Sequence, residues 1–171
     1  APEGAADPGV TDEARKALAG GIEEAGWQQV QVPGPWSSYG EGWKSAGEAV
    51  FRRTVEVPAG WVGCTLQLDL GGIQATDTVT FDGHPIGATD PGAAAGSLPK
   101  RLYTVPAGLV KAGQSVLAVR VWSPTPAGGL RGTGAATAQP EDLSLSANPF
   151  YHPDYRRDYE LGDDPYRYYR W

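Results

Sequence analysis

The chain holds few of the side chains that enzymes use as nucleophiles or metal ligands. Its two histidines are His84 and His152, and its single cysteine is Cys64. A catalytic thiol needs a neighbouring base, and neither histidine is close to Cys64 in sequence. A small apolar side chain is therefore the favoured interpretation of this cysteine. A zinc site would have to rest mainly on carboxylates, which is an uncommon arrangement.

The short motifs of common catalytic and nucleotide-binding sites are absent from the sequence. The serines near Gly34 and Trp43 do not have the G-x-S-x-G spacing of a nucleophile elbow. The sequence has no phosphate-binding G-x-x-x-x-G-K-[ST], no C-x-x-C and no H-E-x-x-H. We therefore predict that the protein is not an enzyme.

Three aspartates near the ends of predicted strands are candidates for a structural calcium site: Asp69, Asp77 and Asp82. Calcium takes roughly six to eight oxygen ligands, backbone carbonyls included. The favoured alternative is that these aspartates are solvated carboxylates in turns. The prediction is no cofactor, with structural calcium as the one ion left open.

An aromatic, glycine-rich loop over 36–48 is the first candidate binding surface. It contains Trp36, Tyr39 and Trp43, whose ring faces could stack on the C–H face of a sugar. The favoured alternative is that Trp36 caps the core and the other two rings pack the loop down. Glycan binding through these three residues remains open.

The last 25 residues, 147–171, are the second candidate surface. They hold 8 of the 17 aromatic residues of the chain, together with four arginines. Disordered tails are usually poor in aromatics, whereas Tyr, Trp and Arg are enriched at protein interfaces. We expect this tail either to dock onto a partner protein or to fold back over its own domain, and both can hold. The predicted docking residues are Tyr151, Tyr155, Arg156, Tyr159, Tyr166, Arg167, Tyr168, Tyr169 and Trp171.

The elements that must position these residues are mostly strands. The 24 glycines and 15 prolines suit many short strands joined by turns better than helices. One short helix is expected over 11–19, because Thr11 can cap it and acidic residues follow. Asp82-Gly83 is typical of a tight hairpin turn. Alternating or apolar runs predict strands over 29–32, 49–57, 64–70, 77–81, 101–105, 115–122 and 143–145.

These patterns predict an all-β protein, a jelly-roll β-sandwich with a short N-terminal helix and an aromatic C-terminal extension. Residues 1–24 form a leader and the helix, 25–146 the sandwich, and 147–171 the docking tail. Both faces of the strand over 115–122 are largely apolar, so we expect it at the centre of a sheet.

Charge and length limit the classes of partner. The net charge of −6 and the lack of a basic run disfavour nucleic acid. No apolar stretch approaches the roughly 20 residues of a membrane-spanning helix, so no span of its own is expected. The sequence has no methionine and begins at Ala1, which is typical of a chain whose signal peptide has been removed. We therefore expect an extracytoplasmic protein, either periplasmic or secreted.

The region from Trp27 to about Gly132 resembles the sugar-binding domain of glycoside hydrolase family 2, a jelly-roll sandwich of the galactose-binding-like class. The resemblance is carried by stretches in the order of that family: Trp27 to Pro33 with Trp36, EAVFRRTVEVP over 48–58, LGGI at 70–73 running to Ile86-Gly87, Tyr103 to Pro106, 113–121, and Gly128-Gly129-Leu130.

The resemblance implies a non-catalytic domain, because in that family the catalytic carboxylates lie on a separate barrel. Such a barrel needs about 250 residues, and about 40 follow Leu130 here. The resulting hypothesis is an accessory or scaffolding subunit of a larger, extracytoplasmic or membrane-bound protein assembly that docks through its aromatic tail. The alternative is a carbohydrate-binding module that uses the aromatic loop.

Overall fold

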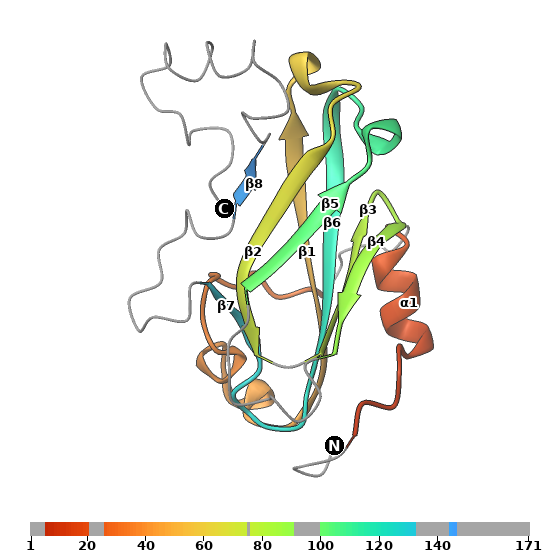
Figure 1. The fold of residues 1–171 in the computed structure, drawn as a ribbon. Helices are drawn as coiled ribbons and strands as arrows, with labels where there is room; N and C mark the ends of the chain where they lie inside the picture. Colours follow the sequence, from red (N-terminus) through yellow and green to blue (C-terminus); the bar gives the residue numbers. More distant parts are fainter. Residues whose placement is uncertain (1–5, 21–25, 75, 91–99, 133–143, 147–171) are drawn as a thin grey trace.

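Two antiparallel sheets pack face to face in the computed structural model (Figure 1). The structure describes residues 6–20, 26–74, 76–90, 100–132 and 144–146. The strand order of the first sheet is β1-β6-β3-β4, and that of the second is β5-β2-β7, with β8 also paired to β2. The strands are β1 (Gly47–Val57), β2 (Leu66–Gln74), β3 (Thr76–Phe81), β4 (His84–Thr89), β5 (Lys100–Val105), β6 (Gly113–Ser123), β7 (Gly129–Gly132) and β8 (Ser144–Ser146).

The core lies between the two sheets, because alternate residues of each strand point inward. In β2 these are Leu66, Leu68 and Leu70, all fully buried. In β6 they are Leu117, Val119 and Val121. The all-β sandwich expected from the sequence is confirmed, and β6 occupies the predicted central position between β1 and β3.

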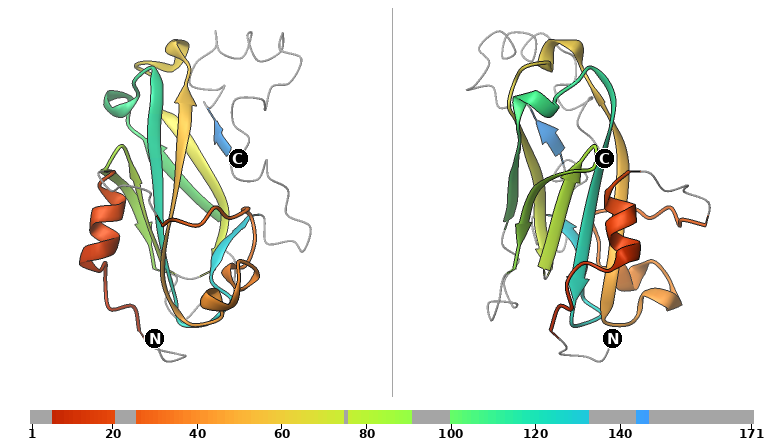
Figure 2. Two further views of the ribbon diagram at one scale, coloured as in Figure 1. Left: turned by 180° about the vertical axis from the view of Figure 1, so that it is seen from behind. Right: turned by 90° about the vertical axis from the view of Figure 1, so that its right-hand side faces the viewer.

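The outer face of β6 is also buried, because the N-terminal segment covers it. Helix α1 (Asp12–Leu18) packs against β1 and β6 (Figure 2) through Ala14, Ala17 and Leu18. The Thr11 side chain caps this helix by accepting a hydrogen bond of 3.2 Å from the Ala14 N–H, as the sequence predicts. The Thr80 hydroxyl of β3 donates to the Leu18 carbonyl at 2.8 Å and fixes the other end.

The predicted tight turn joins β3 to β4. Asp82 and Gly83 both have positive φ, 47° and 75°, which is the geometry that Asp-Gly favours in a two-residue hairpin. The Asp82 carboxylate accepts a hydrogen bond of 2.6 Å from the Val116 N–H of β6. A side chain at position 83 would also meet the Ala19 carbonyl, since a Cβ there would lie 2.8 Å from it.

The structure corrects the prediction at several positions. Residues 29–32 are not a strand; Gly34 and Trp36 instead donate backbone hydrogen bonds to Leu130 and Gly128. Strand β7 was not expected, since it contains glycine, which weakens strand propensity. The Asp82-Gly83 hairpin implied a returning strand, but the range of that strand, β4, was not predicted. The connections between strands contain short 3₁₀ helices at Trp36–Ser38, Glu41–Trp43, Ala59–Trp61 and Ala107–Leu109. No helix of the described segments is long and apolar enough to cross a membrane.

Candidate functional site

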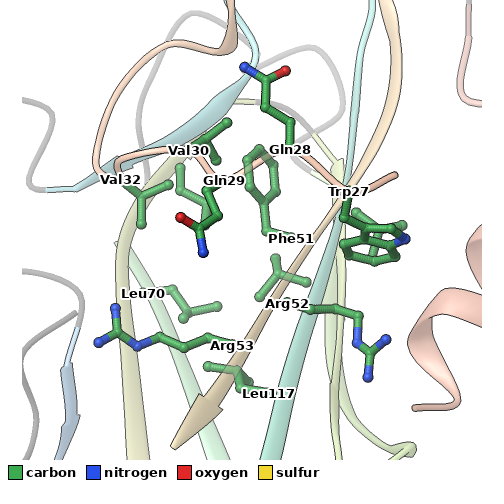
Figure 3. A pocket seen from close by; sticks show the side chains of 13 residues that line it. Trp27, Gln28, Gln29, Val30, Val32, Phe51, Arg52, Arg53, Leu70 and Leu117 are labelled. Carbon is green, nitrogen blue, oxygen red and sulfur yellow. The ribbon is translucent and has the colours of Figure 1, made fainter. Parts of the chain in front are cut away.

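A pocket of about 480 Å³ opens between the sheets along one long edge of the sandwich. We call this the open edge; it runs between β1 of the first sheet and β7 and β8 of the second. The floor of the pocket consists of inward-facing apolar side chains, and residues 27–32 form its outer wall (Figure 3). The apolar lining residues are Val30, Val32, Val50, Phe51, Leu70, Leu117, Val119 and Leu130.

Polar and cationic side chains border this apolar floor. Gln28 and Gln29 are exposed on the outer wall. Arg53 alternates with Phe51 and Val55 on the inner face of β1, so its stem lies among apolar residues and its guanidinium reaches the pocket (Figure 3). Burial lowers the pKa of Arg53 from its ordinary value, but a guanidinium remains charged in proteins.

Arg52 lies on the opposite face of β1 and belongs to the outer surface. Its guanidinium carbon stands 5.4 Å from the centre of the Trp27 ring, a cation–π contact. It also donates a hydrogen bond of 3.3 Å to the Gly20 carbonyl. Arg52 and Arg53 thus lie on opposite faces of β1, and both side chains border the pocket.

The aromatic loop adjoins the pocket through Phe51. The Tyr39 and Trp43 rings meet edge to face with centroids 5.5 Å apart, and Phe51 lies 6.3 and 6.2 Å from them. The Trp36 ring centroid is 6.5 Å from that of Trp43. Because Trp36 is only 2% exposed, its face is not accessible to a ligand. Tyr39 and Trp43 are half-buried, so sugar stacking by this loop stays a prediction that rests on these two rings.

Gln28 ties the loop to the pocket wall. Its amide oxygen accepts a hydrogen bond of 2.9 Å from the Trp43 indole N–H, and its amide nitrogen donates to the Tyr39 carbonyl at 2.8 Å. The Tyr39 hydroxyl donates to the Gly34 carbonyl at 3.3 Å. Burial raises the pKa of Tyr39 to about 12, so the hydroxyl stays protonated and available as a donor at neutral pH.

The opposite long edge, between β4 and β5, is closed by a buried polar cluster, and we call it the sealed edge. The carboxylate of Asp77 in β3 accepts hydrogen bonds from the Arg101 guanidinium and the Tyr103 hydroxyl of β5. The Tyr103 hydroxyl also lies 2.8 Å from that of Thr89 in β4. The Tyr103 ring covers Gly87, where a Cβ would stand only 2.2 Å from the ring. These contacts join the two sheets.

Electrostatics at the sealed edge reflect this burial. The charges of Asp77 and Arg101 are almost fully removed from water. Burial raises the pKa of Asp77, and the hydrogen bonds from Tyr103 and Arg101 act in the opposite direction. Burial, together with the adjacent carboxylate, raises the pKa of Tyr103. Each of these polar groups is hydrogen-bonded to another member of the cluster, which is the arrangement expected of a structural cluster.

The three calcium candidates do not come together. Asp77 faces Arg101 and Tyr103, and Asp82 accepts the Val116 N–H. Asp69 pairs with the Lys100 ammonium at 2.7 Å on the outer face of the second sheet. Across the described ranges, no three His, Cys, Asp or Glu side chains are grouped so that they could hold a metal ion.

A second buried arginine, Arg120, fastens the N-terminal segment to the outer face of the first sheet. Its guanidinium forms a two-pronged pair with Asp7, at 2.7 Å for each nitrogen, and donates to Glu48 and to the Gly9 carbonyl. The Thr11 hydroxyl donates to the same Glu48. The hydrogen bond from Arg120 lowers the pKa of Asp7. Sequence reasoning missed this cluster, because Asp7 lies 113 residues from Arg120 along the chain.

The remaining predicted site residues lie at the margins or beyond the description. Cys64 is half-buried, and its thiol lies 3.9 Å from the Gly60 carbonyl. His84 is exposed at the start of β4. The docking residues Tyr151, Tyr155, Arg156, Tyr159, Tyr166, Arg167, Tyr168, Tyr169 and Trp171 all lie outside the described residues.

The chain resembles part of several solved glycoside hydrolases in fold. A β-glucuronidase from Ruminococcus gnavus matches 67% of this chain at 17% identity and a TM-score of 0.50. A family 2 β-galacturonidase from Eisenbergiella tayi matches 54% at 22% identity, with a TM-score of 0.44. No family model and no curated protein sequence matches the chain.

These matches cover only a small part of each enzyme, 19% of the β-glucuronidase and 14% of the β-galacturonidase. At such low identity the likeness concerns the fold alone. The resemblance inferred from the sequence is thereby confirmed at the level of the fold: the chain has a two-sheet sandwich similar to the matched part of the β-glucuronidase.

Proposed function

We propose that the chain is a non-catalytic accessory or scaffolding subunit of a larger extracytoplasmic or membrane-bound assembly, and that it docks through residues 147–171. The sandwich serves as a rigid body that carries this tail. The partner is a protein surface with pockets for tyrosine and arginine, the residue types that dominate binding at interfaces.

The observation that carries the proposal is the point in the sequence at which the tail begins. Strand β8 pairs with residues 67–69 of β2, and the aromatic segment begins immediately after its last residue, Ser146. The tail therefore starts from a strand of the sheet. The described part of the core is formed by side chains of the strands and of their connections.

The buried charges support a non-catalytic role. Asp77 with Arg101, and Arg120 with Asp7 and Glu48, are the prominent buried ionic groups of the described segments, and each is engaged within the chain. A catalytic pair would have to present a carboxylate or a base to a substrate. In addition, the fold likeness covers only 12–19% of the length of the matched enzymes.

A pull-down in mild detergent from the native source tests the proposal. The full chain should recover a defined set of proteins, and a chain ending at Ser146 should lose them. The truncated chain must still melt cooperatively, so that the loss reflects the tail and not unfolding. Undiminished recovery of the same proteins by the truncated chain would contradict the proposal.

A carbohydrate-binding module is the second candidate, and the half-buried rings of Tyr39 and Trp43 favour it. The short helices of this loop, Trp36–Ser38 and Glu41–Trp43, lie toward the end of the sandwich where β1 begins, whereas β8 lies toward the end where β1 finishes (Figure 1). The two candidates can thus be separated by mutation. On a glycan array, Trp43→Ala should abolish binding, and Leu102→Ala, which alters an exposed apolar residue of β5, should preserve it. Absence of any glycan signal for the full chain would rule this candidate out.

A further inference from the structure

We propose that the pocket at the open edge is the seat of the chain's own tail, and that an aromatic side chain from residues 147–171 fills it. The inference rests on the proposed function only in treating this segment as a docking tail. It deepens that function by stating where the tail is held on its own sandwich before a partner binds.

The lining of the pocket indicates an apolar occupant. Phe51, Leu70, Leu117, Val119 and Leu130 belong to the inner faces of the strands, the surfaces that a closed sandwich would bury. Its volume, about 480 Å³, falls in the range of roughly 300–1,000 Å³ typical of ligand pockets. Removing aromatic and aliphatic surface from water at this site stabilises the occupied state.

The register of β8 places the start of the tail within reach. Ser146 lies opposite Gln67 of β2, on the side of β2 away from β5. Leu70 in the pocket floor is three residues further along β2, about 10 Å at the rise of a strand. Tyr155 follows Ser146 by nine residues, which span about 30 Å when extended. The tail can therefore turn back and enter the pocket, and the short tether gives a high effective concentration.

A polar group at the pocket suits a tyrosine of the tail. Gln29 on the exposed wall offers an amide group to a phenol hydroxyl. A buried tyrosine ring needs such a partner for its hydroxyl.

Photo-crosslinking in the full-length chain tests the inference. A benzoylphenylalanine replaces Gln29, an exposed residue on the pocket wall, and the products are mapped by mass spectrometry. The expected result is an intramolecular crosslink to residues 147–171. The matched control carries the same group at Lys16, exposed on α1, and should give no such crosslink.

A mixture of isotopically labelled and unlabelled chains distinguishes crosslinks within one molecule from crosslinks between two molecules. Crosslinks between a light and a heavy chain would assign the pocket to the tail of another copy and overturn the inference. Crosslinks that never reach 147–171 would overturn it as well, and would leave the pocket to a small ligand or a partner. If the crosslink forms but truncation does not affect the pull-down, only the proposed function fails.

A pocket-filling variant gives an independent measurement. Val30→Trp places a ring into the pocket from its outer wall, and trypsin can cut the tail after Arg156 and Arg157. If the tail is seated, cleavage at these bonds should become several-fold faster in Val30→Trp than in the natural chain. Equal cleavage rates in two folded proteins with the same melting temperature would contradict the inference.

Discussion

The two long edges of the sandwich are closed in different ways. At the sealed edge, Asp77 of one sheet accepts hydrogen bonds from Arg101 and Tyr103 of the other, and the Tyr103 ring covers Gly87. At the open edge, the inner faces of the same two sheets border a pocket of about 480 Å³ behind residues 27–32. One edge is filled by the side chains of neighbouring strands, and the other offers an apolar site.

The difference separates a structural polar cluster from a candidate binding surface. Buried charges draw attention as potential catalytic groups. Here, however, the most buried ionic pair, Asp77 with Arg101, joins two sheets. The apolar pocket has few charged groups, yet it is the surface that an aromatic tail would fit. The following predictions test each edge in order of decreasing effect.

Asp77→Ala should produce the largest loss of stability. Removing one partner of a buried ion pair costs about 3–5 kcal/mol, because the other charge stays buried without its counter-ion. Urea unfolding measures the change. The matched control is Glu41→Ala, which removes the exposed pair with Lys44 and should cost no more than about 1 kcal/mol. Equal losses for both variants would show that the sealed edge depends little on its ion pair.

Tyr103→Phe should give the next largest effect. The variant keeps the ring over Gly87 and removes the hydroxyl that donates to Asp77. A hydrogen bond to a charged group contributes about 1.5–3 kcal/mol. Tyr39→Phe in the aromatic loop removes a hydrogen bond to a neutral carbonyl and should cost only about 0.5–1.5 kcal/mol. The reverse order in urea unfolding would contradict the assignment of the cluster.

Gly87→Ala tests the close approach of the ring at the sealed edge. A Cβ there would lie 2.2 Å from Tyr103, so the ring must move. Overpacking of this kind costs about 1–3 kcal/mol. Gly42→Ala is the control, since nothing lies within 4 Å of a Cβ at that position. Thermal unfolding should show a lower Tm for the first variant and little change for the second.

The N-terminal segment should give a smaller effect that depends on pH. Because Arg120 lowers the pKa of Asp7, the folded state favours the ionised carboxyl. The resulting stability is present above the ordinary value of 3.8 and is lost as the pH falls through the lowered pKa. Asp7→Asn should therefore reduce stability at neutral pH and flatten its decline in acid. If urea unfolding shows the same loss of stability in acid for Asp7→Asn, that loss arises from other carboxyl groups.

Local patterns were sufficient to predict most of the sandwich. The alternation over 49–57 and 115–122 reflects strands whose two faces have different environments, and Asp82-Gly83 reflects backbone geometry alone. Residues 29–32 show the same alternation but form no strand. Here the alternation places Val30 and Val32 against the pocket. Strand β7 depends on pairing with the distant strand β2, and such pairing overrides weak local propensity. Strand β4 instead pairs with its neighbour β3 across the Asp82-Gly83 turn.

Candidate sites whose residues are close in sequence could likewise be predicted, and those whose residues are distant could not. Trp36, Tyr39 and Trp43 are close in sequence, so their association could be predicted, as could the packing of Trp36 onto the core. Asp77 and Arg101 are 24 residues apart and belong to different sheets, so no spacing pattern connects them. The pocket depends on how two sheets and a connecting segment pack, which a single sequence does not encode locally.

Hydrogen exchange on the full chain and on a chain ending at Ser146 tests the central comparison most directly. If the tail fills the open edge, its removal should accelerate exchange in residues 27–32 and in β1, and leave β4 and β5 unchanged. Both chains must melt cooperatively. Identical exchange at the open edge with and without the tail would contradict the proposal that the tail is seated there.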